Sequence, residues 1–260
     1  MVHGRGGGVL SPWLFARYIR VLLEKVVTSG VGCNIDGLIV NVLAYADDIV
    51  HIVPSWHAMQ RLLDIVAEHS LVIDMVINIH KTVCMVFMPK NHDRIIKLSF
   101  PVFCIGEESL NYVSSFKYLG HRIASNNVDN DDIQREIGNL FYRTNVLLRR
   151  FSRCSVAVKT VLFKSFCICM YDAALWTSYN IGVVNKLRSS YIKCIKIFFG
   201  YKRRDSVTGM LFRLGLPSFD TLLLNAAVSF NRQLLLCNNV IVRQLQLVNC
   251  KILYYILLLV

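Results

Sequence analysis

The stretch that decides the fold is Leu43-Ala44-Tyr45-Ala46-Asp47-Asp48-Ile49-Val50. Apolar, β-type residues precede it from position 38 and follow it to position 53, and Pro54 ends the second run. This pattern predicts a β-hairpin with a short acidic tip. Because adjacent residues of a strand point to opposite faces, both carboxylates can approach one site only through a turn.

Two neighbouring carboxylates repel each other, and a divalent cation relieves that repulsion. Hard oxygen ligands favour Mg²⁺ or Mn²⁺. The functional interpretation of Asp47 and Asp48 is therefore half of a two-metal site for phosphoryl transfer. The alternative is a solvated hairpin turn, since Asp is a common turn residue.

The composition indicates a globular protein with a polyanionic partner. The chain has 260 residues, 54% of them hydrophobic, and a net charge of +12. This length allows one large domain or two modest ones. Thirteen Lys and Arg but a single acid, Asp172, lie between Phe141 and Arg204, so the whole positive excess comes from this region. Such clustering is typical of a nucleic-acid-binding face, although a solvated helical face has the same composition.

The cysteines and the C-terminal tail bear on the cellular compartment and on zinc or membrane binding. Nine Cys without a signal peptide predict reduced thiols in a cytosolic or nuclear compartment. Cys167 and Cys169 are too close in sequence for a zinc pair, so we expect core cysteines and no zinc. The apolar tail 252–260 is far shorter than the ~20 residues of a membrane span, so no membrane partner is expected.

The N-terminal region predicts a glycine-rich turn that leads into a helix. Ser11 is a natural N-cap and Pro12 suits the first helical turn. Apolar residues then recur at helical spacing at Leu14, Tyr18, Leu22 and Val26. Glycines beside an Arg can receive a phosphate or lie under a base pair, because the backbone approaches closely there. A flexible N-terminus is the alternative.

Two blocks of the sequence resemble the reverse transcriptases of non-LTR, LINE-type retrotransposons. The first is Gly-Gly-Val-Leu-Ser-Pro-x-Leu-Phe at 7–15, and the second is Tyr-Ala-Asp-Asp at 45–48. The resemblance implies that Asp47 is the metal ligand, that Asp48 supports it and that Tyr45 lies near the primer end. It also implies that nucleotides are positioned by Arg5, Gly7, Gly8 and Ser11. The family has Gln at the place of Gly6, which puts nucleotide positioning in doubt.

Two later blocks extend this resemblance. Asn78-Ile79-His80-Lys81-Thr82, before an expected strand at 83–88, is similar to the family motif whose Lys lies near the departing pyrophosphate. The alternative for Lys81 is a solvated charge. After an expected strand at 97–105 and a turn at 106–108, a second hairpin is similar to the family's primer grip. It consists of Phe116, Lys117, Tyr118, Leu119 and Gly120. An aromatic strand packed on the palm is the alternative.

The remaining pattern is helical. A helix is expected at about 55–71, with a buried stripe of Met59, Leu62, Leu63 and Val66. Three more follow: one from 129 with Ile133, Ile137, Leu140, Thr144 and Leu147 along one side, one from 158 to past Trp176, and one at 183–199. Ser206 is expected to cap another, and the last two are expected at 222–236 and 240–260.

These elements predict an α+β fold in three parts. Residues 1–122 are expected to be a partial polymerase palm, 123–204 a basic helical thumb and 205–260 a C-terminal helical extension. By the resemblance, the thumb grips an RNA template paired with a DNA primer. The predicted nucleic-acid-binding residues are Arg149, Arg150, Arg153, Lys159 and Lys164.

The resemblance implies RNA-directed DNA synthesis from dNTPs with Mg²⁺ or Mn²⁺, but one part of that machinery is not found. The family has a further catalytic Asp before the first block, and the first Asp of this chain is Asp36. Two-metal transfer needs that carboxylate to bridge the ions. The chain is therefore expected to be an N-terminally truncated fragment that is inactive alone. The alternatives are a non-catalytic nucleic-acid-binding remnant and an unfolded fossil reading frame.

Overall fold

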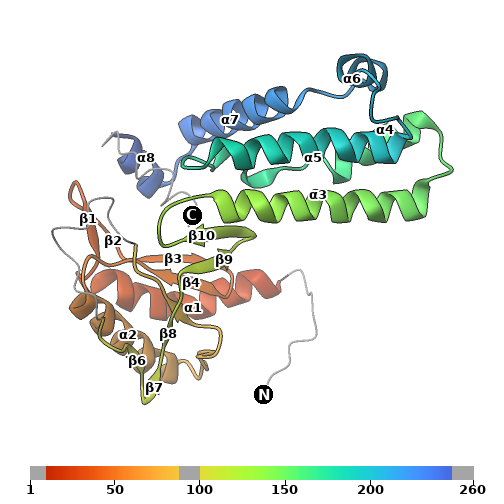
Figure 1. The fold of residues 1–260 in the computed structure, drawn as a ribbon. Coiled ribbons are helices and arrows are strands. Elements are labelled where there is room, and N and C mark those ends of the chain that lie inside the picture. The colour runs from red at the N-terminus through yellow and green to blue at the C-terminus, as the bar shows by residue number, and fades with distance from the viewer. Residues whose placement is uncertain (1–9, 88–99, 248–260) are drawn as a thin grey trace. The chain divides into compact units, whose positions relative to one another are not determined.

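A computed structural model describes residues 10–87 and 100–247, and its chain divides into two compact units (Figure 1). The first unit contains the residues up to Ser114 and those from Asn238 onward, and the second runs from Ser115 to Cys237. Small sheets occupy the N-terminal region and helices dominate the C-terminal region, which confirms the α+β prediction. The functional boundaries expected at 122 and 204 stay predictions.

Two helices and a group of small sheets form the first unit. Helix α1 (Ser11–Thr28) packs against α2 (Trp56–Val72) through Ile19, Leu22, Val26, Leu62 and Val66. The buried stripe of α1 therefore differs from the prediction, because Leu14 and Tyr18 are exposed and Ile19 takes their place. Pro12 does lie in the first turn, but Leu10 occupies the N-cap position and Ser11 is the first helical residue.

Helix α2 agrees with the prediction. The side chain of Ser55 caps it by accepting a hydrogen bond from the N–H of Ala58. Leu62, Leu63 and Val66 are buried, and Met59 packs half-buried against a neighbouring cluster that contains Leu63, Cys84 and Leu110.

The strands of the described residues form five two-stranded sheets, four of them in the first unit. Three of these four are antiparallel and the pair β5–β8 is parallel. Their bounds are β1 (Cys33–Ile35), β2 (Leu38–Val40), β3 (Val42–Tyr45), β4 (Asp48–His51), β5 (Val83–Cys84), β6 (Cys104–Ile105), β7 (Glu108–Ser109) and β8 (Asn111–Tyr112). The turn expected at 106–108 is the tip of the hairpin β6–β7.

Three expected strands are shorter than the sequence pattern indicated. The apolar run before the acidic hairpin is split at Asn41 into β2 and β3, and β2 pairs with β1 instead. The strand expected at 83–88 ends at Cys84, and that expected at 97–105 is a strand only at Cys104–Ile105. Positions 88 and 97–99 lie outside the described residues.

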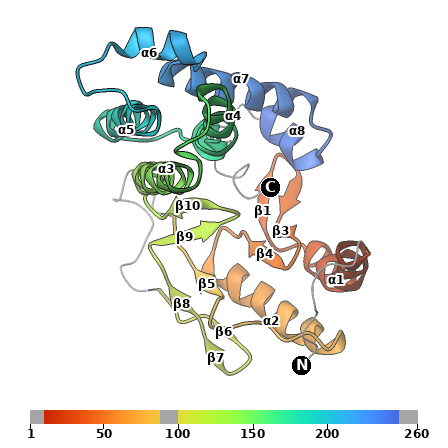
Figure 2. The same cartoon turned by 90° about the vertical axis from the view of Figure 1, so that its right-hand side faces the viewer.

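Helices make up most of the second unit, in which α3 and α5 pack side by side along their lengths. Figure 2 views these two helices nearly end-on. The unit begins with the hairpin β9 (Ser115–Tyr118) and β10 (His121–Ala124). Its helices are α3 (Asn130–Phe151), α4 (Val156–Phe166), the 3₁₀ turn η1 (Tyr171–Ala174), α5 (Ile181–Phe199), α6 (Val207–Leu214) and α7 (Phe219–Leu236).

The predictions for α3, α5, α6 and α7 are confirmed in the main. All five residues of the expected α3 stripe are buried. Ser206 caps α6 through the N–H of Gly209, and Ser218 caps α7 through the N–H of Thr221. The core of this unit centres on Phe163, Tyr191 and Phe198, each at most 1% exposed.

Helix α4 ends ten residues earlier than expected. It stops at Phe166, and Trp176 follows the separate turn η1. The N–H groups of Thr177 and Ser178 donate to the carboxylate of Asp129, the residue before α3, so these two residues are bonded to a side chain and not to helix carbonyls. The buried residue of α4 is Phe163, whereas Val158 and Phe166 are exposed.

Helix α8 (Val240–Leu247) belongs to the first unit and packs against β2. The remainder of the helix expected at 240–260 lies outside the described residues. Among the described helices, none is by itself long and apolar enough to span a membrane, and α6 and α7 pass this test only as a pair bent by 54°. Of the described cysteines, all free, Cys84, Cys167 and Cys194 are buried and the others are half-buried.

Candidate functional site

The acidic hairpin β3–β4 has the geometry that the sequence predicted. Tyr45 pairs with Asp48, so Ala46 and Asp47 form a two-residue tip. Ala46 adopts a left-handed backbone conformation, with φ of 53°. This conformation is costly for a residue with a Cβ atom and is rare outside Gly, Asn and Asp. The turn places Asp47 in the tip and Asp48 at the first position of β4.

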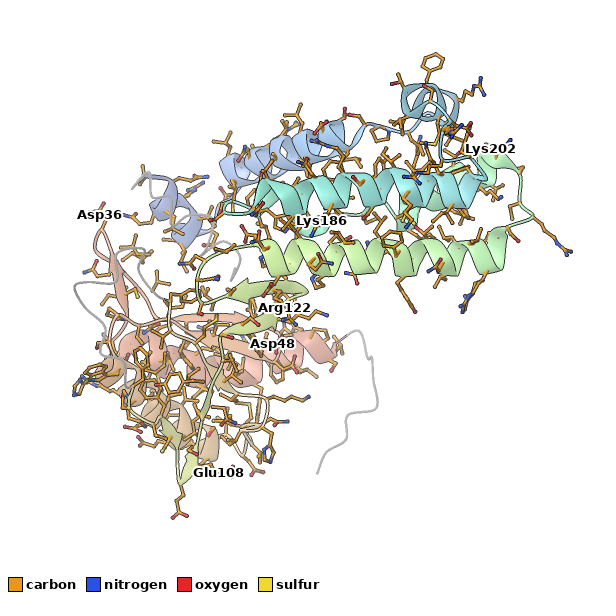
Figure 3. The ribbon with its side chains drawn as sticks, in the orientation of Figure 1. Asp36, Asp48, Glu108, Arg122, Lys186 and Lys202 are labelled. Atoms are coloured by element: carbon orange, nitrogen blue, oxygen red, sulfur yellow. The ribbon has the colours of Figure 1, made fainter. Side chains whose placement is uncertain are left out.

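Both carboxylates are available to a ligand. Asp47 and Asp48 are exposed, as is Tyr45 at 59%, and Figure 3 shows Asp48 at its end of the strand. Neither carboxylate makes a hydrogen bond or ion pair with any residue in 10–87 or 100–247. The donor set, two unpaired carboxylates on adjacent residues, suits Mg²⁺ or Mn²⁺. Within the described residues, the one grouping of three or more possible metal ligands lies elsewhere, at His121, Asp132 and Asp172.

Asn41 fixes the base of the acidic hairpin. Its side chain is 2% exposed and donates to the carbonyl oxygens of Val26 at 2.7 Å and Val31 at 2.8 Å. Its own carbonyl accepts from the N–H of Ile52 at 3.1 Å. Asn41 thus ties the end of α1 to both strands of the hairpin. We did not identify it from the sequence, where a polar residue inside an apolar run was the available signal.

Lys81 lies on a turn that Asn78 closes. The N–H of Lys81 donates to the Asn78 side-chain oxygen at 3.2 Å, and the Thr82 hydroxyl donates to the Asn78 carbonyl at 2.9 Å. Asn at the first position and Thr at the last therefore stabilise the turn itself, while Lys81 is exposed. Its predicted role near the leaving group stays a prediction. Of the predicted nucleotide-positioning residues, Ser11 is exposed on α1, whereas Arg5, Gly7 and Gly8 lie outside the described residues.

The second hairpin, β9–β10, presents part of the predicted primer grip to solvent. Lys117 is exposed and Phe116 is 38% exposed, whereas Tyr118 is buried. Leu119 and Gly120 form the two-residue tip with φ of 46° and 96°. Positive φ at both positions is typical of the tight turns that join twisted strands.

A buried polar cluster lies beneath this hairpin, and we name it the Asp132 cluster: His121, Asp132, Arg135, Asp172 and Trp176. Asp132 is fully buried and accepts hydrogen bonds from the Arg122 main-chain N–H at 2.9 Å, Arg135 Nε at 2.7 Å and Trp176 Nε1 at 2.9 Å. Arg135 also donates to Asp172 Oδ2 at 2.5 Å. Nδ1 of His121 lies 3.2 Å from Asp132 Oδ2 and 3.9 Å from Asp172 Oδ2.

The electrostatics distinguish these acids. Burial alone would raise the pKa of Asp132, but the contacts from His121, Arg135 and Trp176 outweigh it and hold that pKa well below its usual range. Burial raises the pKa of Asp172, as does the nearby charge of Asp132, and burial also raises the pKa of Asp129. Asp132 is therefore the member of the cluster that stays ionised most strongly.

The ligand atoms of His121, Asp132 and Asp172 lie within 4.8 Å of one another, which is close enough for a metal site. However, the guanidinium of Arg135 already bridges Asp132 and Asp172. A divalent ion would have to displace this cation, so the arrangement is better explained as an ion-pair cluster. We did not identify His121, Arg135 or Asp172 as partners from the sequence, because the cluster forms only when Arg135, three residues from Asp132, also meets Asp172 at a separation of 37 residues.

The predicted nucleic-acid-binding residues differ in their exposure. Arg149, Arg150, Arg153 and Lys164 are exposed and form no ion pair within the described part of the chain. Lys159 is half-buried, with its ammonium 5.5 Å from the centre of the Phe198 ring. The four exposed cations lie along the last turn of α3, the following turn and α4, where they can contact phosphates.

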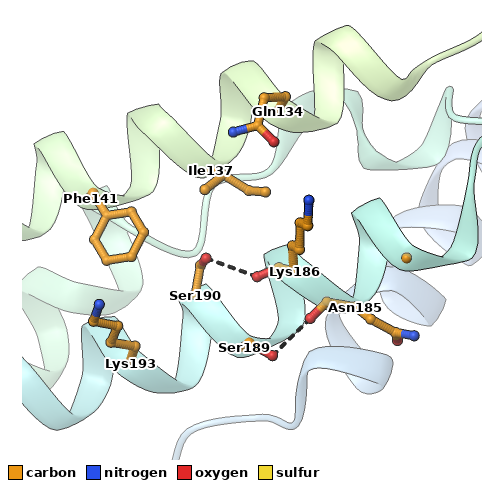
Figure 4. A pocket seen from close by; sticks show the side chains of 9 residues that line it. Gln134, Ile137, Phe141, Asn185, Lys186, Ser189, Ser190 and Lys193 are labelled. Atoms are coloured by element: carbon orange, nitrogen blue, oxygen red, sulfur yellow. Dashed lines mark hydrogen bonds between the residues drawn. The ribbon is translucent and has the colours of Figure 1, made fainter.

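A groove between α3 and α5 adds further cations that the sequence analysis did not single out. Its volume is about 580 Å³. Figure 4 shows Lys186 and Lys193 on the α5 side, and Gln134, Ile137 and Phe141 on the α3 side. The Lys193 ammonium lies 5.5 Å from the centre of the Phe141 ring. This combination of cations with an aromatic ring suits a nucleic-acid strand.

Comparison with known protein families identifies the N-terminal region. Residues 5–123 match the family model described as "Reverse transcriptase (RNA-dependent DNA polymerase)". This match covers the hairpin β3–β4, the turn that carries Lys81 and all but the last residue of the hairpin β9–β10. No curated protein matches the chain.

Proposed function

We propose, from the premise that residues 5–123 are a reverse transcriptase domain, that this chain binds an RNA template paired with a DNA primer in the manner of non-LTR retrotransposon enzymes. The observation that carries the proposal is the β3–β4 hairpin. It exposes Asp47 and Asp48 at its tip, without partners in residues 10–87 and 100–247. Adjacent carboxylates without protein partners are suitable oxygen ligands for a hard divalent cation.

The residues of the domain take separate roles in this proposal. Asp47 holds a divalent ion and Asp48 supports it, and Tyr45 lies near the primer end. When bound, Mg²⁺ or Mn²⁺ neutralises charge that develops on the dNTP phosphates during transfer. Lys81 assists the departing pyrophosphate, and Phe116 and Lys117 contact the primer. Arg149, Arg150, Arg153, Lys159 and Lys164 contact the nucleic-acid backbone.

The proposal also sets a limit on catalysis. Two-metal transfer needs carboxylates that hold the two metal ions about 3.5–4 Å from each other. The described residues bring no third His, Cys, Asp or Glu to Asp47 and Asp48. We therefore expect this chain alone to bind template–primer but to extend it poorly or not at all.

Primer extension on an RNA template, with Mg²⁺ and dNTPs, tests this proposal beside an Asp47→Ala control. If the wild type extends the primer and the variant does not, the two carboxylates suffice and the limit stated above is wrong. If neither extends, a binding titration with labelled template–primer decides the rest. Binding in the micromolar range or tighter supports the proposal, and its absence at low salt contradicts it.

A second candidate function is that of a non-catalytic remnant that only binds nucleic acid. The concentration of the net positive charge between Phe141 and Arg204 favours it. Under this alternative, affinity falls steeply with salt and Asp47→Ala has no effect even when Mg²⁺ is present. A Mg²⁺-dependent effect of Asp47→Ala on nucleotide binding supports the reverse transcriptase role instead.

A further inference from the structure

We propose that Asp132 is a positioning residue for the primer-contacting hairpin β9–β10, and that it acts through the main-chain N–H of Arg122. This inference rests on the proposed function, because it presumes that Phe116 and Lys117 of that hairpin contact the primer. It assigns a role to a buried acid that lies outside the matched family region at 5–123.

The register of the hairpin connects Asp132 with Lys117. Arg122 lies directly opposite Lys117, and Ile123 lies opposite Phe116. The Asp132 carboxylate accepts from the Arg122 N–H at 2.9 Å, so it is bonded to the backbone partner of the exposed Lys117. A hydrogen bond to a charged acceptor is stronger than one between neutral groups. Asp132 thus holds the strand from which Lys117 is presented.

Asp132 is itself held in one position. Its carboxylate is fully buried and receives two further hydrogen bonds, from Arg135 and Trp176. Arg135 is held in turn by Asp172, which lies on η1. One carboxylate therefore joins the hairpin to α3 and to the segment that contains η1 and Trp176, in the unit 115–237.

The imidazole of His121, the residue that directly follows the hairpin tip, also lies in this cluster. It is 3% exposed, and neither ring nitrogen has a hydrogen-bond partner of good geometry among the described residues. Its nearest polar neighbours are Asp132 and Asp172, so the ring is directed into the cluster. The strand after the tip is consequently held by the backbone of Arg122, while the buried His121 ring packs beside the carboxylates of Asp132 and Asp172.

A functional reason for this arrangement follows from the tip. Leu119 has a positive φ although it carries a Cβ atom, and such a conformation persists only where the surroundings enforce it. The hairpin buries Tyr118 and Ile123, but two strands alone are only marginally stable in water. The buried cluster supplies the constraint that keeps Phe116 and Lys117 in one orientation before the primer arrives, which reduces the ordering cost of binding.

The test combines a binding measurement with a double-mutant cycle. Asp132→Asn keeps the shape of the side chain but removes its charge, and Lys117→Ala removes the direct contact. We expect Asp132→Asn to weaken template–primer binding about tenfold, because an ordered hairpin then has to be selected from a looser ensemble. In the background of Phe116→Ala and Lys117→Ala, the effect of Asp132→Asn on binding should disappear, although its effect on the Tm remains.

Salt dependence separates positioning from direct contact. Lys117→Ala should reduce the slope of log Kd against log salt by about one, whereas Asp132→Asn should leave the slope unchanged. Trp176→Phe is a milder variant for the case in which Asp132→Asn does not fold, since it removes one donor from the carboxylate. It should weaken binding in the same direction and by a smaller factor.

The outcomes are distinguishable. If Lys117→Ala weakens binding and neither Asp132→Asn nor Trp176→Phe does, the positioning inference is wrong while the proposed function stands. If Phe116→Ala and Lys117→Ala have no effect on binding, the proposed primer contact itself is wrong. If Mn²⁺ or Zn²⁺ raises the Tm of the wild type but not of a His121→Asn variant, the cluster is a metal site and the ion-pair mechanism is overturned.

Discussion

The two acidic sites of this chain, the Asp47–Asp48 pair and the Asp132 cluster, differ in nearly every physical respect. Asp47 and Asp48 are exposed at a hairpin tip and have no bonded partner among the described residues. Asp132 is fully buried and accepts three hydrogen bonds. The same side chain is therefore either open to solvent or part of the buried hydrogen-bond network, and the difference lies in whether donors surround it. Each experiment below tests this contrast.

Removal of Asp132 should produce the largest effect on stability. Asp132→Ala leaves Arg135 and His121 in a buried site without their main anion, and the loss of one partner of such a pair costs about 3–5 kcal/mol. Asp47→Ala removes no contact to a described residue, so its effect should stay within about 0.5 kcal/mol. Urea unfolding followed by circular dichroism measures both. Equal losses would show that Asp47 is bonded after all.

Low pH should reduce the folding stability of the protein through protonation of Asp132. Its pKa in the folded protein is held below its usual range, so its stabilising contribution is present above about pH 4 and is lost as the pH falls further. Asp129 and Asp172 have raised pKa values, so they act in the opposite sense and take up protons first.

A series of Tm measurements from pH 6 to pH 3 checks this sign. The wild type should lose stability steeply in the lowest part of that range, and Asp132→Asn should be less stable at pH 6 and show a shallower loss. A parallel decline of the two proteins would assign the acid sensitivity to other carboxylates.

The binding of divalent ions should depend on the exposed acidic site, Asp47 and Asp48. Mn²⁺ binding, measured by calorimetry, should fall below detection in Asp47→Asn with Asp48→Asn, because the hard oxygen ligands lose their charge. Asp132→Asn is the matched control and should leave Mn²⁺ binding unchanged, since Arg135 already neutralises that carboxylate. Loss of Mn²⁺ binding in Asp132→Asn alone would move the ion to the buried cluster.

Local patterns were sufficient to predict the acidic hairpin at Tyr45–Asp48, because its residues lie within ten positions of one another. The motif at Asn78–Thr82 and the hairpin around Leu119–Gly120 were expected from the family resemblance, and both are local structures as well. Helical periodicity predicted the buried stripe of α3 for the same reason. The capping residues Ser55, Ser206 and Ser218 also act on backbone groups close in sequence.

The buried cluster could not be predicted because its partners are distant in sequence. Asp132 meets Trp176 and Arg135 meets Asp172 across separations of 44 and 37 residues. Asp129 likewise binds the N–H groups of Thr177 and Ser178, at separations of 48 and 49 residues. The prediction of the buried stripe of α1 was wrong for a related reason, because the packing partners on α2 decide which apolar face of α1 is buried.

The smallest expected effect concerns the backbone at the acidic tip. Ala46 has a positive φ, which costs an alanine roughly 1–2 kcal/mol relative to glycine, while glycine loses roughly 0.5–1 kcal/mol through the entropy of the unfolded chain. Ala46→Gly should therefore be neutral or stabilising by up to about 1 kcal/mol. Ala44→Gly, two residues earlier in β3, has no such relief and should destabilise by roughly 0.5–1 kcal/mol.

The sign of this difference, measured by urea unfolding, shows whether the tip stores strain that keeps Asp47 and Asp48 in one turn. If Ala46→Gly also loosens Mn²⁺ binding, the rigidity of alanine at this position contributes to the metal site. If both glycine variants destabilise equally, the tip is unstrained and the two carboxylates are held by their strand pairing alone.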